Sequence, residues 1–201
     1  MYGGGCNNSS SSGDDKPPVD NTDNPDNPDD PGTGGDETEN IIVNVNVAFK
    51  NCNADIYADG KFVLPKAETK KNEDGKVEDK DPAEINLNFA DPFDASAYEK
   101  LTFDVDAETR NDSGPTFLLL GDGDWNPVIS KWGAMGVYSD NGKYNYTVDL
   151  SELDKDKTKD DLKTLKAITI VATSKYAFTV YDNFKFEGSG GTATLKLNVT
   201  E

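Results

Sequence analysis

Residues 116–150 read TFLLLGDGDWNPVISKWGAMGVYSDNGKYNYTVDL and hold the feature that decides the fold. An apolar strand at 117–120 leads into a Gly/Asp-rich segment, and a second strand follows at 144–150. Paired strands usually need a turn of about two to five residues, whereas the 22 residues from Gly121 to Gly142 separate these two. Both tryptophans, Trp125 and Trp132, lie in this long connection. Long loops with large aromatic side chains are common binding elements. We therefore interpret the remaining chain as the scaffold of this long connection.

Outward from this segment, most of the chain alternates apolar and polar residues with a period of two, which is typical of half-buried strands. Residues 41–49 and 100–108 are clear examples. Turn signals separate the strands: Asp59-Gly60 predicts a hairpin, 65–82 an exposed loop or hairpin, and 91–94 a turn. Only 151–163 is expected to be helical. About nine strands with almost no helix predict an all-β fold, an antiparallel β-sandwich of the jelly-roll type.

The charge of the chain excludes several classes of function. The net charge is −18, with no histidine and a single arginine, whereas a nucleic-acid-binding protein needs a positive surface. Without histidine, Ser-His-Asp and Cys-His nucleophiles and the usual histidine-bearing zinc sites are excluded. Carboxylate chemistry and cations with oxygen ligands remain open.

The first 40 residues differ in composition from the rest. They hold ten acidic side chains, one lysine and five of the ten prolines, and such a segment buries too little apolar surface to offset the entropy of ordering. We therefore predict a disordered acidic linker over 1–40 and one globular domain over 41–201.

We expect different roles for the two cysteines, Cys6 and Cys52. The stretch around Cys6, GGGCNNSSSS, resembles the mature start of a bacterial lipoprotein, which implies a lipid anchor at Cys6 and an extracellular, cell-surface location. The alternative is that Cys6 is an incidental cysteine of the tail. Cys52 is expected to be a buried or half-buried thiol, with a Cys6–Cys52 disulfide as the alternative. Since no stretch approaches 18 consecutive apolar residues, membrane contact is expected only through the anchor.

Four segments, taken in order, resemble a carbohydrate-binding module with the jelly-roll fold. They are YEKLTFDV at 98–105, YTVDLSEL at 146–153, LKAITI at 165–170 and VYDNFKF at 180–186. The resemblance spans about 41–187 and departs from the family at Val180-Tyr181, where the family pattern is Tyr-Ile. It implies sugar binding on a concave sheet face or in the loops at its edge, often with a structural calcium ion.

Candidate ligand-binding residues follow from sugar chemistry. A pyranose ring stacks its C–H face on Trp or Tyr, and its hydroxyls pair with planar polar groups. Each candidate has a packing or ion-pairing alternative, which for the arginine is a salt bridge to Glu108. The candidates are Trp125, Trp132, Tyr181, Asp104, Asp106 and Arg110.

A calcium site is a separate expectation, from Asp122, Asp124 and Asp182. Asp122 and Asp124 alternate as in the first half of an EF-hand loop, but Pro127 stands where the sharp-turn glycine belongs, so an EF-hand is rejected. A looser calcium site and an unliganded acidic turn both remain open.

The sequence thus predicts a monomeric, non-catalytic protein that binds a polysaccharide or oligosaccharide. One alternative is a structural or adhesive surface domain with a protein partner. The other is a glycoside hydrolase, because Asp104, Asp106 and Glu108 share one strand face. Retaining hydrolysis needs carboxyl groups about 5–5.5 Å apart, whereas positions i and i+4 of a strand are about 13 Å apart, which disfavours catalysis.

Overall fold

In a computed structural model of the protein, the structure describes residues 39–107, 114–123, 125–133, 143–173, 177–189 and 191–200. The chain divides into two compact units, Met1–Asp36 and Glu37–Glu201, and all described residues belong to the second unit. Cys6, Glu108, Arg110 and Asp124, which the sequence singles out, lie outside the described residues.

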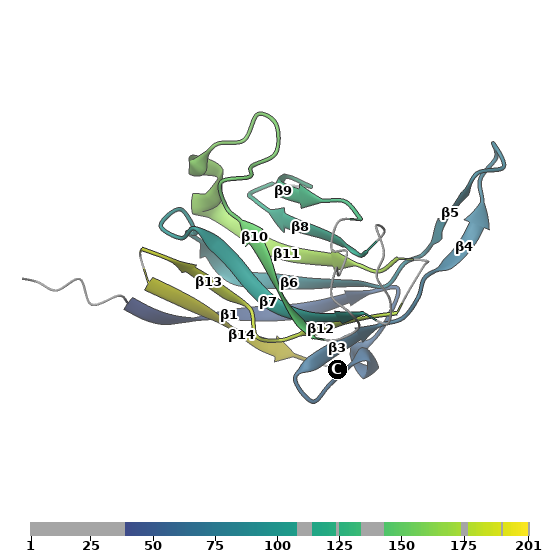
Figure 1. The fold of residues 1–201 in the computed structure, drawn as a ribbon, viewed down its shortest axis with the longest axis horizontal. Helices are drawn as coiled ribbons and strands as arrows, with labels where there is room; N and C mark the ends of the chain where they lie inside the picture. Colours follow the sequence, from purple (N-terminus) through teal and green to yellow (C-terminus); the bar gives the residue numbers. More distant parts are fainter. Residues whose placement is uncertain are drawn as a thin grey trace, which may run out of the picture. The chain divides into compact units, whose positions relative to one another are not determined.

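The second unit is built almost entirely from strands, which confirms the predicted all-β fold (Figure 1). The elements in chain order are β1 (Glu39–Lys50), the 3-10 helix η1 (Ala54–Ile56), β2 (Tyr57–Ala58), β3 (Lys61–Leu64), β4 (Glu68–Lys71), β5 (Val77–Lys80), β6 (Glu84–Phe93), β7 (Lys100–Ala107), β8 (Thr116–Leu120), β9 (Pro127–Lys131), β10 (Tyr144–Asp149), the 3-10 helix η2 (Lys159–Thr164), β11 (Leu165–Val171), β12 (Phe178–Tyr181), β13 (Lys185–Gly188) and β14 (Gly191–Val199).

Twelve strands form one continuous sheet, and β4 and β5 form a separate two-stranded hairpin. The sheet runs β2-β3-β12-β7-β13-β14-β1-β6-β11-β8-β9, and β10 pairs with β7. Strand β7 has β10 along one edge, while β12 and β13 share its other edge. The predicted antiparallel pairing holds with one exception in the described residues, since β1 and β14 run parallel.

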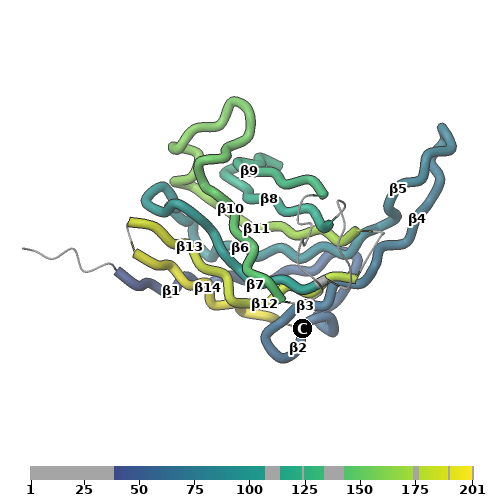
Figure 2. The backbone as a smooth tube through the Cα atoms, viewed as in Figure 1, coloured from purple at the N-terminus to yellow at the C-terminus, as the bar shows by residue number. Residues whose placement is uncertain are grey.

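The sheet folds over so that two layers enclose an aromatic core, which confirms the predicted sandwich. Phe103 of β7 stacks on Phe184 with ring centroids 4.5 Å apart. It also contacts Phe117 of β8 at 5.9 Å and Tyr146 of β10 at 5.3 Å. The β7–β10 pair therefore packs over the strands that include β8, and Figure 2 shows β10 crossing in front of β11.

The long connection at 121–142 corrects the sequence interpretation, because it contains a strand. Strand β9 pairs with β8, and β10 pairs with β7, so the two flanking strands of this segment do not pair with each other. Pro127 starts β9 at the end of the sheet path, where its missing N–H costs no ladder bond. The free side of β9 is covered by Asp154, whose backbone N–H donates to Val128 O at 2.9 Å.

Two further expectations change in the structure. The predicted helix at 151–163 is shorter and is a 3-10 helix, because a Thr158–Asp161 capping box starts η2 and β11 follows it directly. The turn expected at 91–94 is wrong, since β6 continues to Phe93, which is buried and pairs across a bulge with Leu165. Both predicted hairpins are confirmed, with β2–β3 turning at Asp59-Gly60 and β4–β5 lying fully exposed.

Candidate functional site

The structure brings the two tryptophans together on the β8–β9 hairpin. Their ring centroids are 6.4 Å apart and the ring planes are inclined by 50°. Trp125 is 61% exposed and Trp132 is 63% exposed, which places both among the few exposed large apolar side chains of the described residues. A contiguous exposed apolar surface is a candidate interaction site. We refer to Trp125 and Trp132 below as the tryptophan pair.

The turn that carries Trp125 is held by several polar contacts. Trp125 has a φ of +47°, in the left-handed region that L-residues with a Cβ occupy only at a cost. The Gly121 N–H donates to Asn126 O at 2.9 Å, and Asn126 Nδ2 donates to Asp122 O at 2.7 Å. The Lys157 ammonium donates to the Asn126 side-chain oxygen. These contacts fix the turn in spite of the strained residue, so the position of the first ring is determined by the fold.

The other end of the hairpin is anchored as firmly. Beside Trp132, the Gly133 N–H donates to Thr116 Oγ1 at 3.2 Å. Within β9, the Ser130 N–H donates to Asp154 Oδ1 at 2.9 Å and its hydroxyl donates to the other carboxylate oxygen at 2.5 Å. The second ring therefore projects from the turn that directly follows β9, a strand bonded on both sides.

Two of the three predicted calcium ligands, Asp122 and Asp182, have polar partners in the structure. Asp122 pairs with Lys166 at 2.8 Å, and this charge-assisted hydrogen bond holds the pKa of the Asp122 carboxyl below its usual value. Asp182 lies in a different turn, where its carboxylate accepts the Tyr57 hydroxyl at 2.6 Å. No group of three or more metal-ligating side chains occurs among the described residues.

A second polar cluster surrounds Asp104 on the outer face of β7. Lys143 Nζ lies 2.8 Å from Asp104 Oδ2, and Asn145 Nδ2 donates to Oδ1 at 3.0 Å. Asn183 donates to Oδ2 at 2.9 Å and accepts the Asp104 N–H at 2.9 Å. Asn183 stands between β12 and β13, so its amide takes the place of a strand partner for β7.

Two opposing effects act on the pKa of Asp104. Partial burial alone would raise this pKa, but hydrogen bonds from Lys143, Asn145 and Asn183 outweigh burial and lower it. The same contact with Asp104 raises the pKa of Lys143. Asp104 is thus a carboxylate already bonded to three donors.

The Asp104 cluster also reaches the predicted Tyr181. The Lys143 ammonium lies 4.2 Å from the centre of the Tyr181 ring, within the range of a cation–π contact. Asp106 is half-buried and lies on β7 opposite Thr179. Sequence reasoning missed Lys143, Asn145 and Asn183. The signal for Asn145 was its outward position in the alternating strand YNYTVD, whereas Asn183 sits in the quoted VYDNFKF segment.

The remaining expectations concern the cysteines and the membrane. Cys52 is a half-buried free thiol whose pKa is raised by burial, in agreement with the prediction. Its Sγ lies 3.4 Å from Lys50 O and 3.6 Å from Glu84 O. Among the described residues, no helix has the length and hydropathy of a membrane-spanning segment.

Comparisons with known proteins found no matching family model and no matching curated protein. Twelve solved chains match in structure. One is the family 11 carbohydrate-binding module from Clostridium thermocellum in complex with a β-1,3-1,4-mixed-linked tetrasaccharide, at 14% identity, over 72% of this chain and 89% of that chain, with a TM-score of 0.38. Another is CBM28, a carbohydrate-binding module specific for non-crystalline cellulose, at 18% identity, over 66% and 78%, with a TM-score of 0.38.

A third is the low-affinity xylan-binding module CBM86 from Roseburia intestinalis, at 13% identity, over 67% of this chain and 93% of that chain, with a TM-score of 0.32. These are proteins of the kind that the sequence segments resemble.

Proposed function

We propose that this protein is a non-catalytic module that binds a polysaccharide or oligosaccharide at the cell surface. The observation that supports this proposal is the tryptophan pair, with two indole rings more than 60% exposed on one rigid hairpin. Exposing both rings to water is unfavourable, and the hairpin also keeps Trp125 in a strained conformation. A ligand with an apolar face would cover the rings and offset this cost.

A pyranose ring has such a face. Its axial C–H groups stack on an indole, while its hydroxyls stay at the rim where they can meet water or polar side chains. The 50° angle between the rings makes two non-parallel faces at the tryptophan pair. This geometry suits a bent or twisted glycan better than a flat crystalline sheet, because two successive sugars can then each face one ring.

The Asp104 cluster is a secondary part of the proposal. Asp104 and Asp106 offer carboxylates, Tyr181 offers an aromatic ring, and Arg110 follows on the same chain segment. Lys143 covers part of the Tyr181 ring, so a sugar would have to displace this ammonium. The tryptophan pair needs no such displacement, and it is therefore the first site to test.

The environment of Asp104 does not suit the general acid of a glycosidase. A glycosidase acid must keep its proton near neutral pH, which requires a raised pKa. The pKa of Asp104 is instead lowered by its hydrogen-bond donors. An adhesive domain with a protein partner remains the second candidate, favoured by the same exposed tryptophan pair.

Calcium and the lipid anchor remain predictions. Asp122 and Asp182 already have a lysine and a tyrosine as partners, so a calcium ion would compete with these contacts. Calorimetric titration with calcium tests the first prediction. Mass spectrometry of Cys6 in the protein isolated from its native membrane tests the second.

Intrinsic tryptophan fluorescence tests the function itself. The protein is titrated with soluble plant and microbial polysaccharides, alongside Trp125→Ala and Trp132→Ala. Ile42→Ala is the matched control, because Ile42 is another exposed large apolar side chain, at 69%, on β1. A sugar-specific shift that both tryptophan variants weaken and the control retains supports glycan binding. If no polysaccharide changes the tryptophan fluorescence of the correctly folded protein, the proposed function is wrong and the adhesive domain is favoured.

A further inference from the structure

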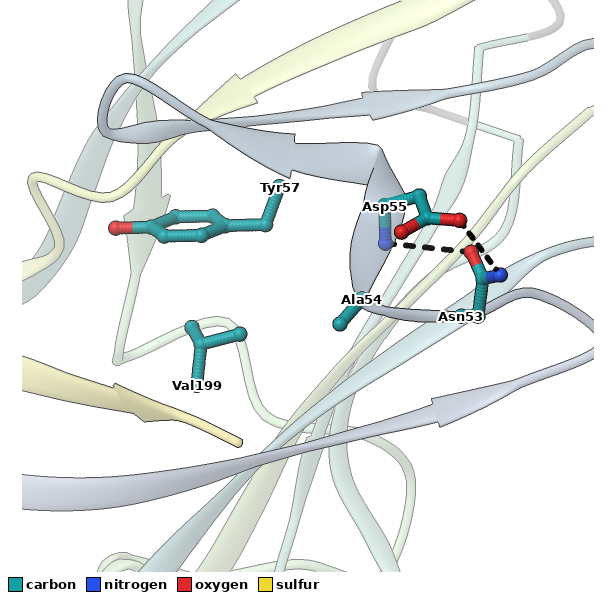
Figure 3. Close-up of a pocket in the computed structure, with 5 residues that line it drawn as sticks. All are labelled: Asn53, Ala54, Asp55, Tyr57 and Val199. Carbon is teal, nitrogen blue, oxygen red and sulfur yellow. Dashed lines mark hydrogen bonds between the residues drawn. The ribbon is translucent and has the colours of Figure 1, made fainter. Parts of the chain in front are cut away.

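A pocket away from the tryptophan pair is lined by residues that the proposed function does not use. It has a volume of about 660 Å³, within the range of about 300–1,000 Å³ that is common for small-ligand sites. It lies where η1 and β2 approach the end of β14. Figure 3 shows its lining side chains, which are Asn53, Ala54, Asp55, Tyr57 and Val199.

The aromatic wall of this pocket is fixed in place. The Tyr57 hydroxyl donates to Asp182 Oδ2 at 2.6 Å, and Phe62 packs against the ring with centroids 4.7 Å apart. Asp182 is itself held by the β2–β3 turn, since its N–H donates to Gly60 O at 3.0 Å. Burial and the bond to Asp182 raise the pKa of Tyr57 to about 12, so the phenol is neutral and keeps its proton for this bond.

The apolar walls face the same space as the ring. In Figure 3 the methyl groups of Val199 and Ala54 lie across the pocket from Tyr57. A flat ligand with C–H groups on its face can therefore contact the aromatic ring on one side and aliphatic carbon on the other. This arrangement selects for a ring-shaped ligand with an apolar face.

The polar edge of the pocket offers mainly acceptors. Asn53 Nδ2 donates to Asp55 Oδ2 at 2.9 Å, and Asn53 Oδ1 accepts the Asp55 N–H at 3.2 Å. One N–H of the Asn53 amide is thus engaged, while the Asp55 carboxylate retains lone pairs. Among the described residues, no lysine pairs with Asp55 and none lines the pocket. This edge therefore carries an exposed carboxylate that can accept hydrogen bonds from a cationic donor.

We propose that this pocket binds an amino-sugar unit of a glycan, with the sugar ring against Tyr57 and a protonated primary amine at Asp55. An ammonium has three donors and no acceptor, which complements a carboxylate edge better than a neutral hydroxyl does. The assignment of a sugar rests on the proposed function, whereas the assignment of a cation rests on the pocket alone.

Titration calorimetry of the full chain tests this inference at mildly acidic pH. The probes are a glucosamine oligosaccharide and its N-acetylated counterpart, which has the same ring but no charge. Asp55→Asn removes the charge from an exposed residue and so leaves the fold intact. Asp59→Asn is the matched control, because Asp59 is an exposed acid in the nearby β2–β3 turn and asparagine tolerates its φ of +50°.

We expect the glucosamine probe to bind, and to bind about tenfold more weakly to Asp55→Asn, the size of effect typical for one charge-assisted hydrogen bond. Tyr57→Ala should also weaken binding, Asp59→Asn should not, and added salt should reduce the affinity. Equal affinity for the N-acetylated probe, or full binding to Asp55→Asn, overturns the inference. Equal competition by a simple diamine overturns the sugar assignment.

The two proposals can fail separately. Loss of the polysaccharide response in Trp125→Ala with an unchanged glucosamine titration places the ligands at two sites and supports both. A glucosamine titration that depends on Asp55, in a protein with no polysaccharide response, retains the cation pocket and removes the proposed function. A polysaccharide response without any glucosamine binding supports the proposed function and removes the cation pocket.

Discussion

Replacing either member of the tryptophan pair with alanine should lower both the free energy of unfolding and the affinity for the glycan, and the two losses can be measured separately. Trp125 is 61% exposed, so about two fifths of its surface is buried. A well-buried tryptophan covers about 150–250 Å², and two fifths of this area at about 25 cal/mol per Å² corresponds to about 1.5–2.5 kcal/mol. The alanine variant retains part of that contact, so we expect the free energy of unfolding to fall by about 1–2 kcal/mol.

The expected loss in binding is of similar size but affects a different equilibrium. A lost aromatic stack costs about 1–2 kcal/mol, which weakens binding by about 5- to 30-fold. Because the rings contact each other, the two substitutions should not be additive in the free energy of unfolding. The double variant should lose less stability than the sum of the single variants, by about 0.5–1.5 kcal/mol.

The backbone at Trp125 supplies an internal control. Its φ of +47° penalises any residue with a Cβ but not glycine, so Trp125→Gly should be more stable than Trp125→Ala by about 1 kcal/mol. Both variants lack the ring and should lose the same binding energy. Chemical denaturation measures stability and fluorescence titration measures binding. Unchanged sugar affinity in correctly folded Trp125→Ala and Trp132→Ala would show that the pair is not the binding surface.

Three further predictions concern stability and assembly. Asp104 has a lowered pKa in the folded state, so its contribution to the free energy of unfolding is complete at neutral pH. This contribution is lost as the pH falls below 3.8 and through the pKa of the folded state, and Asp104→Asn should remove this part of the acid sensitivity in denaturation curves. Gly191→Ala places a Cβ about 2.1 Å from Glu39 O at a φ of +109°, and should destabilise the fold much more than Gly75→Ala, which meets nothing within 4 Å and should cost about 1 kcal/mol. Asp154→Ala keeps the backbone bond to Val128 O but leaves the Ser130 N–H on the edge of β9 without its carboxylate acceptor. Gel filtration should then detect self-association that a lysine added to β9 suppresses.

Part of the candidate site was predictable from local pattern. The two tryptophans stand out because they are the only ones in the chain and lie in a Gly-rich connection. Their contact at 6.4 Å was not predictable, because Trp125 precedes β9 and Trp132 follows it, and an extended strand by itself would keep the two apart. The hydrogen-bond partner of Asp182 was not predictable for a similar reason, since Tyr57 lies 125 residues earlier in the chain.

The sequence by itself determined the secondary structure class of the second unit. Alternation with a period of two is a local property, and it identifies strands such as β1, β6, β7 and β14 wherever they pair. Turn residues at Asp59-Gly60 and Asp74-Gly75 likewise act within a few residues, through backbone φ angles that glycine tolerates.

The tertiary structure alone decided which strands are neighbours and which side chains meet. The parallel pairing of β1 with β14 joins segments about 150 residues apart, and the separation of β8 from β10 depends on β9 taking the edge. Both result from burying apolar faces in one shared core, which depends on all strands at once. For the same reason the pocket between η1 and β14, and the engagement of Asp104 by three donors, exist only in the folded chain.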